Sequence, residues 1–219
     1  MRFASFETST DWCSVALWRD GEVASLEQQA PNRHGELVLP MLERLLAGAG
    51  IGMAQLEAVA FGAGPGSFTG LRIACGVAQG IAFAHGLPVI GISTLEAIAE
   101  ESGAQRVAAC IDARMNEVYF AAFERRTGGW HEAIPAMCMA PASLPGLPDD
   151  GWIGCGNGFA AHGSLGFQIV IPEIHPTAVA VARLAAPRLQ AGEGVDAALA
   201  VPVYVRDKVA LTVAERAAP

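Results

Sequence analysis

The sequence of 219 residues predicts an α/β fold with two units, over residues 1–103 and 104–219, packed together with no flexible linker. Hydrophobic residues make up 52% of the chain and charged residues only 16%, which favours extensive burial over disorder. Strand-type runs alternate with amphipathic segments in the first unit. A pattern of two strands around a tight turn then opens the second unit near residue 106.

Three short runs at the N-terminus have the composition of antiparallel strands. They are RFASFETS, WCSVALWRD and GEVASLEQQ, separated by TD and DG. Residues 34–50 predict a helix that ends at Gly48, and Pro40 either delays its start or bends it. The unit is completed by a strand over 56–61, a helix over 69–85, a strand over 88–92 and a helix over 94–102.

The second unit begins with RVAACIDARMNEVYFAAFER, which predicts two strands joined by a tight turn. It ends with the helical pattern TAVAVARLAAPRLQAG. Between them, APASLPGLPDDG has the proline, glycine and aspartate content of a surface connection. We therefore expect mixed sheets with flanking helices in both units.

Charge and cysteine content exclude several classes of protein. The net charge is −8 and the largest basic cluster is the pair Arg125 and Arg126, so we expect no nucleic-acid affinity of the chain's own. The five cysteines are widely spaced and indicate free thiols in a reducing cytosol. No signal peptide is visible, and the longest apolar run, residues 73–84, is shorter than the roughly 20 residues that span a bilayer. We expect a cytoplasmic protein that does not contact a membrane.

The segment GAGPGSFTGLR, residues 62–72, lies between a predicted strand and a predicted helix and raises the question of a phosphate site. It lacks the lysine of a Walker A loop, and its glycines do not have dinucleotide-binding spacing. Amides at the start of the helix could still bind an anion. The favoured interpretation is a turn that requires glycine, with Ser67 and Thr69 capping the helix.

Four segments together resemble a known family. They are FETSTDWCSVALW, GPGSFTGLRIACGVAQGIAF, IDARMNEVYFA and VPVYVRDKVA, which lie in the family's order and span nearly the whole chain. The chain is similar to the bacterial TsaB family, also called YeaZ, of the tRNA threonylcarbamoyladenosine machinery. This resemblance implies an actin-like ATPase fold made of two ribonuclease-H-like subdomains.

The resemblance also implies a non-catalytic subunit that activates TsaD, the family's catalytic paralogue. TsaD transfers threonylcarbamoyl from its adenylate to the adenosine next to the anticodon of tRNAs that read codons beginning with A. TsaE is implied as a further component, and a homodimer is expected when the chain is alone. No cofactor of the chain's own is implied: ATP or ADP and magnesium are expected in the partner complex, and tRNA only through that complex.

The alternative is a nucleotide-dependent hydrolase or transferase that acts alone through the first hairpin and the glycine loop. The hairpin has no glycine in its turn, and Glu7 stands where the family usually has aspartate, which favours a strand end capped by hydroxyl groups. No two histidines are four residues apart, so a helical metal pair is absent, and Ser67 is not in a G-x-S-x-G motif. We expect no catalytic residue and no metal site.

Eight residues are candidate contacts for a nucleotide or a partner. Asp112 and Arg114 flank the turn of the second hairpin, where they either line a cleft between the units or simply pair across the turn. The full set is Glu7, Ser9, His34, Ser67, Thr69, Arg72, Asp112 and Arg114.

The helices predicted over residues 34–50 and 69–85 are expected to form an interface with another protein. The helix over 69–85 is apolar almost all round, and the sheet of its own unit covers only one side. The alternative is that both helices are interior. The predicted interface comprises Leu37, Val38, Met41, Leu42, Leu45, Ile73, Gly76, Val77, Gly80, Ile81 and Ala84.

Overall fold

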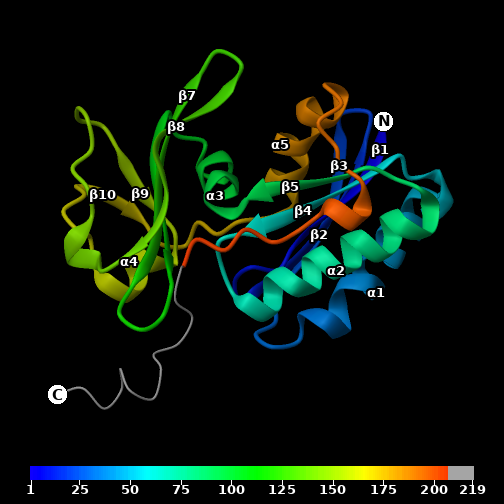
Figure 1. Cartoon of the computed structure of the whole chain (residues 1–219), viewed down its shortest axis with the longest axis horizontal. Coiled ribbons are helices and arrows are strands. Elements are labelled where there is room, and N and C mark those ends of the chain that lie inside the picture. The colour runs from blue at the N-terminus through cyan, green and yellow to red at the C-terminus, as the bar shows by residue number, and fades with distance from the viewer. Residues whose placement is uncertain (207–219) are drawn as a thin grey trace.

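The computed structural model describes residues 1–206, which form two lobes with one five-stranded mixed sheet in each (Figure 1). The sheet of the first lobe has the order β3-β2-β1-β4-β5. Its strands are β1 (Arg2–Glu7), β2 (Trp12–Arg19), β3 (Glu22–Gln29), β4 (Ala58–Gly64) and β5 (Val89–Ser93). The first three are antiparallel neighbours, whereas β4 is parallel to β1 and to β5. The predicted N-terminal strands are confirmed.

The sheet of the second lobe repeats this topology. Its order is β10-β9-β6-β7-β8, with antiparallel pairing of β7 with β6 and β8 and parallel pairing of β9 with β6 and β10. The strands are β6 (Arg106–Asp112), β7 (Val118–Arg126), β8 (Gly129–Met139), β9 (Ile153–Cys155) and β10 (Ile169–Ile171). The predicted hairpin of β6 and β7 is confirmed. The two lobes share the same strand order and the same pattern of strand directions.

Helices cover both faces of the first sheet (Figure 1). Helices α1 (His34–Ala49) and α2 (Phe68–His85) pack on one face, over a core that includes Phe6, Leu42 and Phe61. Helix α5 (Ala178–Gln190) packs on the other face. Helix α3 (Thr94–Ser102) lies between the lobes, and α4 (Asn157–His162) packs on the second sheet. Three short 3-10 turns are η1 (Met53–Gln55), η2 (Pro141–Ser143) and η3 (Ala197–Leu199).

Helix α5 returns to the first lobe, although the sequence division at residue 103 places it in the second unit. It contacts β1, β2, β4 and β5. Its residues Ala180, Val181 and Ala185 are fully buried in the core on that side of the first sheet. The described part of residues 104–219 therefore does not pack as one body.

Helix α1 begins at His34 and contains Pro40 in its interior, so proline does not delay its start. It ends at Ala49, one residue after the predicted end, and is capped by Gly50 in the left-handed conformation. Among the helices of the described chain, none combines the length and hydrophobicity needed to cross a bilayer.

Candidate functional site

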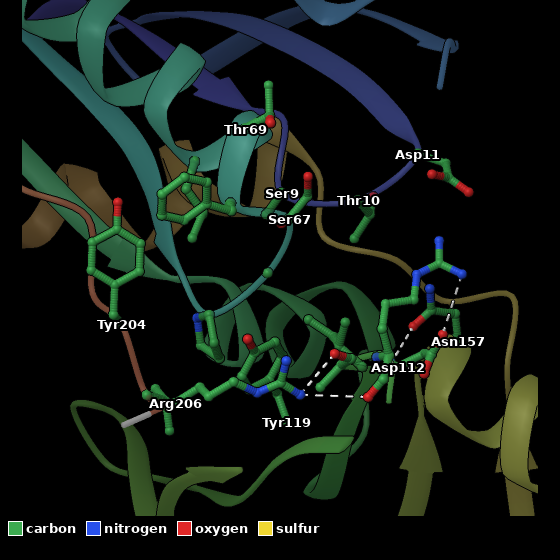
Figure 2. Close-up of a pocket in the computed structure, with 18 of the residues that line it drawn as sticks. Ser9, Thr10, Asp11, Ser67, Thr69, Asp112, Tyr119, Asn157, Tyr204 and Arg206 are labelled. Carbon is green, nitrogen blue, oxygen red and sulfur yellow. Dashed lines mark hydrogen bonds and ion pairs between the residues drawn. The ribbon is translucent and has the colours of Figure 1, made fainter. Parts of the chain in front are cut away.

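A pocket of about 380 Å³ lies between the two lobes (Figure 2). The first lobe lines it with the β1–β2 turn and the start of α2, and the second lobe with the end of β6, the following turn and Tyr119 of β7. Of the eight candidate contacts, the pocket is lined by Ser9, Ser67, Thr69, Asp112 and Arg114.

The glycine loop is bonded directly to the β1–β2 hairpin. The amide of Ser67 donates to the carbonyl oxygen of Ser9 at 2.7 Å, and the Thr8 hydroxyl donates to the carbonyl oxygen of Gly70 at 2.7 Å. A Cβ atom on Gly70 would lie 1.9 Å from the carbonyl oxygen of Thr8, so only glycine permits this approach. The interpretation of the loop as a turn that requires glycine is confirmed.

Ser67 caps helix α2. Its side-chain oxygen accepts a hydrogen bond from the amide of Gly70 at 3.3 Å, which is the capping role predicted for it. Thr69 instead lies exposed in the first turn of the helix and makes no cap. Because the amides of Ser67 and Gly70 are both bonded within the chain, they are not free donors for an anion.

Glu7 is buried behind the hairpin and does not line the pocket, which corrects its prediction as a contact residue. It is 1% exposed, and its Oε1 atom accepts a hydrogen bond from the amide of Ser9 at 2.6 Å. A Cβ atom on Gly62 would lie 1.9 Å from Oε2, so the carboxyl group rests against the Gly62 backbone. Burial raises the pKa of Glu7, and hydrogen bonds from Ser9 oppose that shift. Glu7 therefore lies in the interior of the first lobe.

His34 and Arg72 also lie outside the pocket. His34 is the first residue of α1 and is 6% exposed, so its ring is not available as a contact. The guanidinium carbon of Arg72 lies 3.8 Å from the centre of the Phe68 ring, and its Nε donates to the Tyr204 hydroxyl at 3.2 Å. Arg72 is exposed and stays a candidate for contact with another protein.

Asp112 is the centre of a polar cluster on the second lobe. Its amide donates to Oδ1 of Asn157 at 3.0 Å, and its own Oδ1 accepts from the amide of Arg114 at 3.1 Å. Nε2 of His162 lies 3.4 Å from the same Oδ1 atom. The Arg114 guanidinium is 3.7 Å from Asp112 Oδ2 but 80% exposed, so this ion pair contributes under about 1 kcal/mol. The two residues therefore pair across the turn and also line the cleft.

Sequence reasoning missed most of the pocket wall, including two residues near the end of the described chain. Tyr204 and Arg206 reach the cleft from the segment that follows η3, and Figure 2 shows the Arg206 side chain extending toward Tyr119. This segment forms neither a helix nor a strand in the structure. Its clearest signal was its membership in VPVYVRDKVA, one of the four segments that carry the family resemblance.

The predicted interface separates into an inner and an outer set of residues. The inner set packs in the core between the helices and the first sheet, which corrects its prediction as partner-facing: Val38, Met41, Leu42, Leu45 and Ile81. The outer set is half-buried or exposed: Leu37, Ile73, Gly76, Val77, Gly80 and Ala84. A Cβ atom on Gly76 or Gly80 would meet no atom within 4 Å. Only the outer set is available to another protein.

The cysteines and other potential metal ligands are dispersed. Cys13, Cys75, Cys110 and Cys155 are buried free thiols, and Cys138 is a half-buried one. Burial raises the pKa of Cys110 to about 12, which keeps this thiol protonated. Within residues 1–206, no three side chains of histidine, cysteine, aspartate or glutamate gather where they could hold a metal ion.

Comparison with known proteins identifies the family. The family model described as TsaD, tRNA N6-adenosine threonylcarbamoyltransferase, matches residues 27–180. The tRNA threonylcarbamoyladenosine biosynthesis protein TsaB of Escherichia coli (strain K12) is 38% identical over 96% of both chains. The protein of that name from Haemophilus influenzae is 37% identical over 94% of this chain and 93% of its own.

Solved structures agree with these relatives. The structure of YeaZ from Pseudomonas aeruginosa is 38% identical, has a TM-score of 0.87, and matches 93% of this chain and 99% of its own. A Pseudomonas aeruginosa protein described as similar to the peptidase YeaZ matches with a TM-score of 0.88. The implied actin-like fold with two ribonuclease-H-like subdomains is thereby confirmed. The chain belongs to the TsaB family, also called YeaZ, of tRNA threonylcarbamoyladenosine biosynthesis proteins.

Proposed function

We propose that this chain is a non-catalytic subunit of tRNA threonylcarbamoyladenosine biosynthesis that binds and activates the catalytic paralogue TsaD. In this proposal TsaD transfers the threonylcarbamoyl group to the adenosine next to the anticodon, and TsaE joins the complex. ATP or ADP and magnesium bind in the partner complex. The chain works in the cytoplasm and forms a homodimer when its partner is absent.

The observation that carries the proposal is the exposed face of α2. A glycine inside a helix costs about 1 kcal/mol relative to alanine. Gly76 and Gly80 lie four residues apart on one side of α2, and open space lies where their side chains would point. Nothing in the described chain requires glycine at either position. A second helix that packs closely against α2 would require it.

Exposed apolar side chains lie on the same two helices. Phe83 of α2 is 83% exposed and Leu39 of α1 is 41% exposed, and Ala84 continues the stripe of small residues on α2. A large exposed apolar side chain such as Phe83, on the same helix as a stripe of small residues, is typical of a protein interface. We assign this face, formed by the outer set on α1 and α2, to TsaD in the complex and to a second copy in the homodimer.

Two features of the first lobe beside the cleft support a non-catalytic role. The loop amides of Ser67 and Gly70 are bonded within the chain, and the acid of the first hairpin, Glu7, is buried away from the pocket. An actin-like site that holds phosphates would need such groups to face the ligand. The net charge of −8 supports contact with tRNA only through the complex.

The proposal is tested by reconstitution with the chain alone, the paralogue alone, and both together. ATP hydrolysis and threonylcarbamoyl transfer to tRNA are measured in each mixture. We expect efficient tRNA modification only when both proteins are present. Turnover by this chain alone at a rate comparable to the pair would contradict the proposal and support the alternative of an enzyme that acts by itself.

A further inference from the structure

The segment after η3 runs along α2 and ends on the second lobe (Figure 1, orange to red). We call residues 200–206 the strap. At its start, the carbonyl oxygen of Ala200 accepts a hydrogen bond from Nε2 of Gln79 on α2 at 2.9 Å. Further along, the amide of Val203 donates to the carbonyl oxygen of Ala63 at 2.7 Å. The first part of the strap is therefore fixed to the first lobe.

The strap also packs against the glycine loop and the start of α2. A Cβ atom on Gly64 would lie 2.7 Å from the carbonyl oxygen of Val203, so glycine at this position lets the strap pass. The ring of Tyr204 packs on Phe68 with centroids 5.7 Å apart, and its hydroxyl accepts from Arg72. The strap thus reaches the edge of the cleft in a defined position.

Arg206 connects the strap to the second lobe. Its side chain is 14% exposed, and one terminal nitrogen donates to the carbonyl oxygen of Ala113 at 2.9 Å and to Oε2 of Glu117 at 2.6 Å. Figure 2 shows the guanidinium group directed across the floor of the pocket toward the β6–β7 turn. The guanidinium carbon also lies 5.8 Å from the centre of the Tyr119 ring. A charged group on the strap is therefore largely enclosed by the second lobe.

The turn that Arg206 contacts has an unusual backbone. Arg114, Met115 and Asn116 have φ angles of 62°, 55° and 58°, so three successive residues other than glycine are left-handed. Such conformations persist only where surrounding contacts hold them. Arg206 binds Ala113 and Glu117, the residues on either side of this run.

We infer that the strap is a latch between the two lobes, with Arg206 as the positioning residue that engages the second lobe. The latched strap forms one wall of the pocket and holds the left-handed turn. Release of Arg206 frees the turn to relax and opens the cleft on that side. This inference concerns the isolated chain and does not depend on the proposed partner.

Hydrogen exchange of the full-length chain, followed by mass spectrometry, tests the latch. In the folded chain the amides of Ala113 and Glu117 are hydrogen-bonded across the turn, to Glu117 and Arg114 respectively. We expect Arg206→Ala to accelerate exchange in peptides that cover residues 113–117 by tenfold or more. We also expect small-angle X-ray scattering to show a larger radius of gyration. Unchanged exchange at the turn in folded Arg206→Ala would overturn the inference.

Arg125→Ala is the matched control, because Arg125 is a half-buried arginine of the same lobe that pairs with Glu100 away from the strap. Equal acceleration at the turn in this control would show general destabilisation and overturn the latch. Arg206→Lys keeps the charge beside Glu117 but lacks the planar donor group. This variant replaces Arg206→Ala in the experiment if the alanine variant does not fold. Faster exchange at the turn in Arg206→Lys supports the latch, and wild-type exchange contradicts it.

Discussion

The amide nitrogen of Ser67 lies 2.7 Å from the carbonyl oxygen of Ser9, so the glycine loop and the first hairpin are joined backbone to backbone. This bond uses an amide that an anion site at the start of α2 would need. It depends on the absence of a side chain at Gly70, which contacts the hairpin at Thr8. The loop therefore contributes to the stability of the first lobe.

Replacement of Gly70 by alanine is expected to destabilise the chain, because the new methyl group would overlap the carbonyl oxygen of Thr8. Overpacking of this kind typically costs about 1–3 kcal/mol, and sometimes more. Gly76→Ala is the matched control on the same helix, and its methyl group would meet open space. We expect it to raise the free energy of unfolding by up to about 1 kcal/mol. Urea denaturation measures both, and equal effects of the two variants would be inconsistent with this account.

The buried carboxyl group of Glu7 predicts a specific dependence of stability on pH. Burial raises the folded-state pKa above the ordinary value of 4.5, so the folded chain binds this proton more tightly than the unfolded chain. The resulting stabilisation is complete below that ordinary value and is lost as the pH rises through the folded pKa. Glu7→Gln removes this titration while retaining an acceptor for the Ser9 amide.

We therefore expect the wild-type chain to lose more stability than Glu7→Gln as the pH is raised from about 5 to about 8. Denaturant titrations of both proteins across this range measure the difference, and the change common to both reports the other titrating groups. Parallel stability curves for the two proteins would show that Glu7 does not titrate in this way.

The isolated chain is expected to bind tRNA only weakly. Affinity for nucleic acid depends on neutralising phosphates with clustered basic side chains, whereas this chain has a net charge of −8. A filter-binding assay at physiological salt measures the affinity, with the reconstituted pair as the comparison. Sub-micromolar binding by the isolated chain would refute this expectation.

Periodic segments made much of the first lobe predictable from sequence. Helix α2 shows this well, because its apolar pattern, its Ser67 cap and its glycine-terminated end all indicate the same element. The strands β9 and β10 have only three residues each, too few for a periodic signal. The packing of α5 on the first sheet was also hidden, because sequence order does not determine which sheet a late helix covers.

The pocket and the predicted interface were predictable only in part, because both depend on how elements distant in sequence pack together. An apolar stripe indicates that a helix is buried, but not which side faces its own sheet. Val38 and Leu42 therefore looked as available as Gly76 and Gly80, although the former pack inward. Arg206 was missed because its role depends on a contact with Glu117, which lies far from it in the sequence.

The central claim is that the exposed face of α2 binds another protein. Gly80→Arg tests it, since the arginine side chain meets open space in the free chain but cannot fit a close helix contact. Gly146→Arg on the second lobe is the matched control, because a Cβ atom there also meets no atom within 4 Å. The measurement is size-exclusion chromatography with light scattering, alone and with TsaD, after circular dichroism confirms folding. We predict that Gly80→Arg is a folded monomer that no longer binds TsaD, whereas Gly146→Arg behaves as wild type; a folded Gly80→Arg protein that still dimerises and still binds TsaD would contradict the claim.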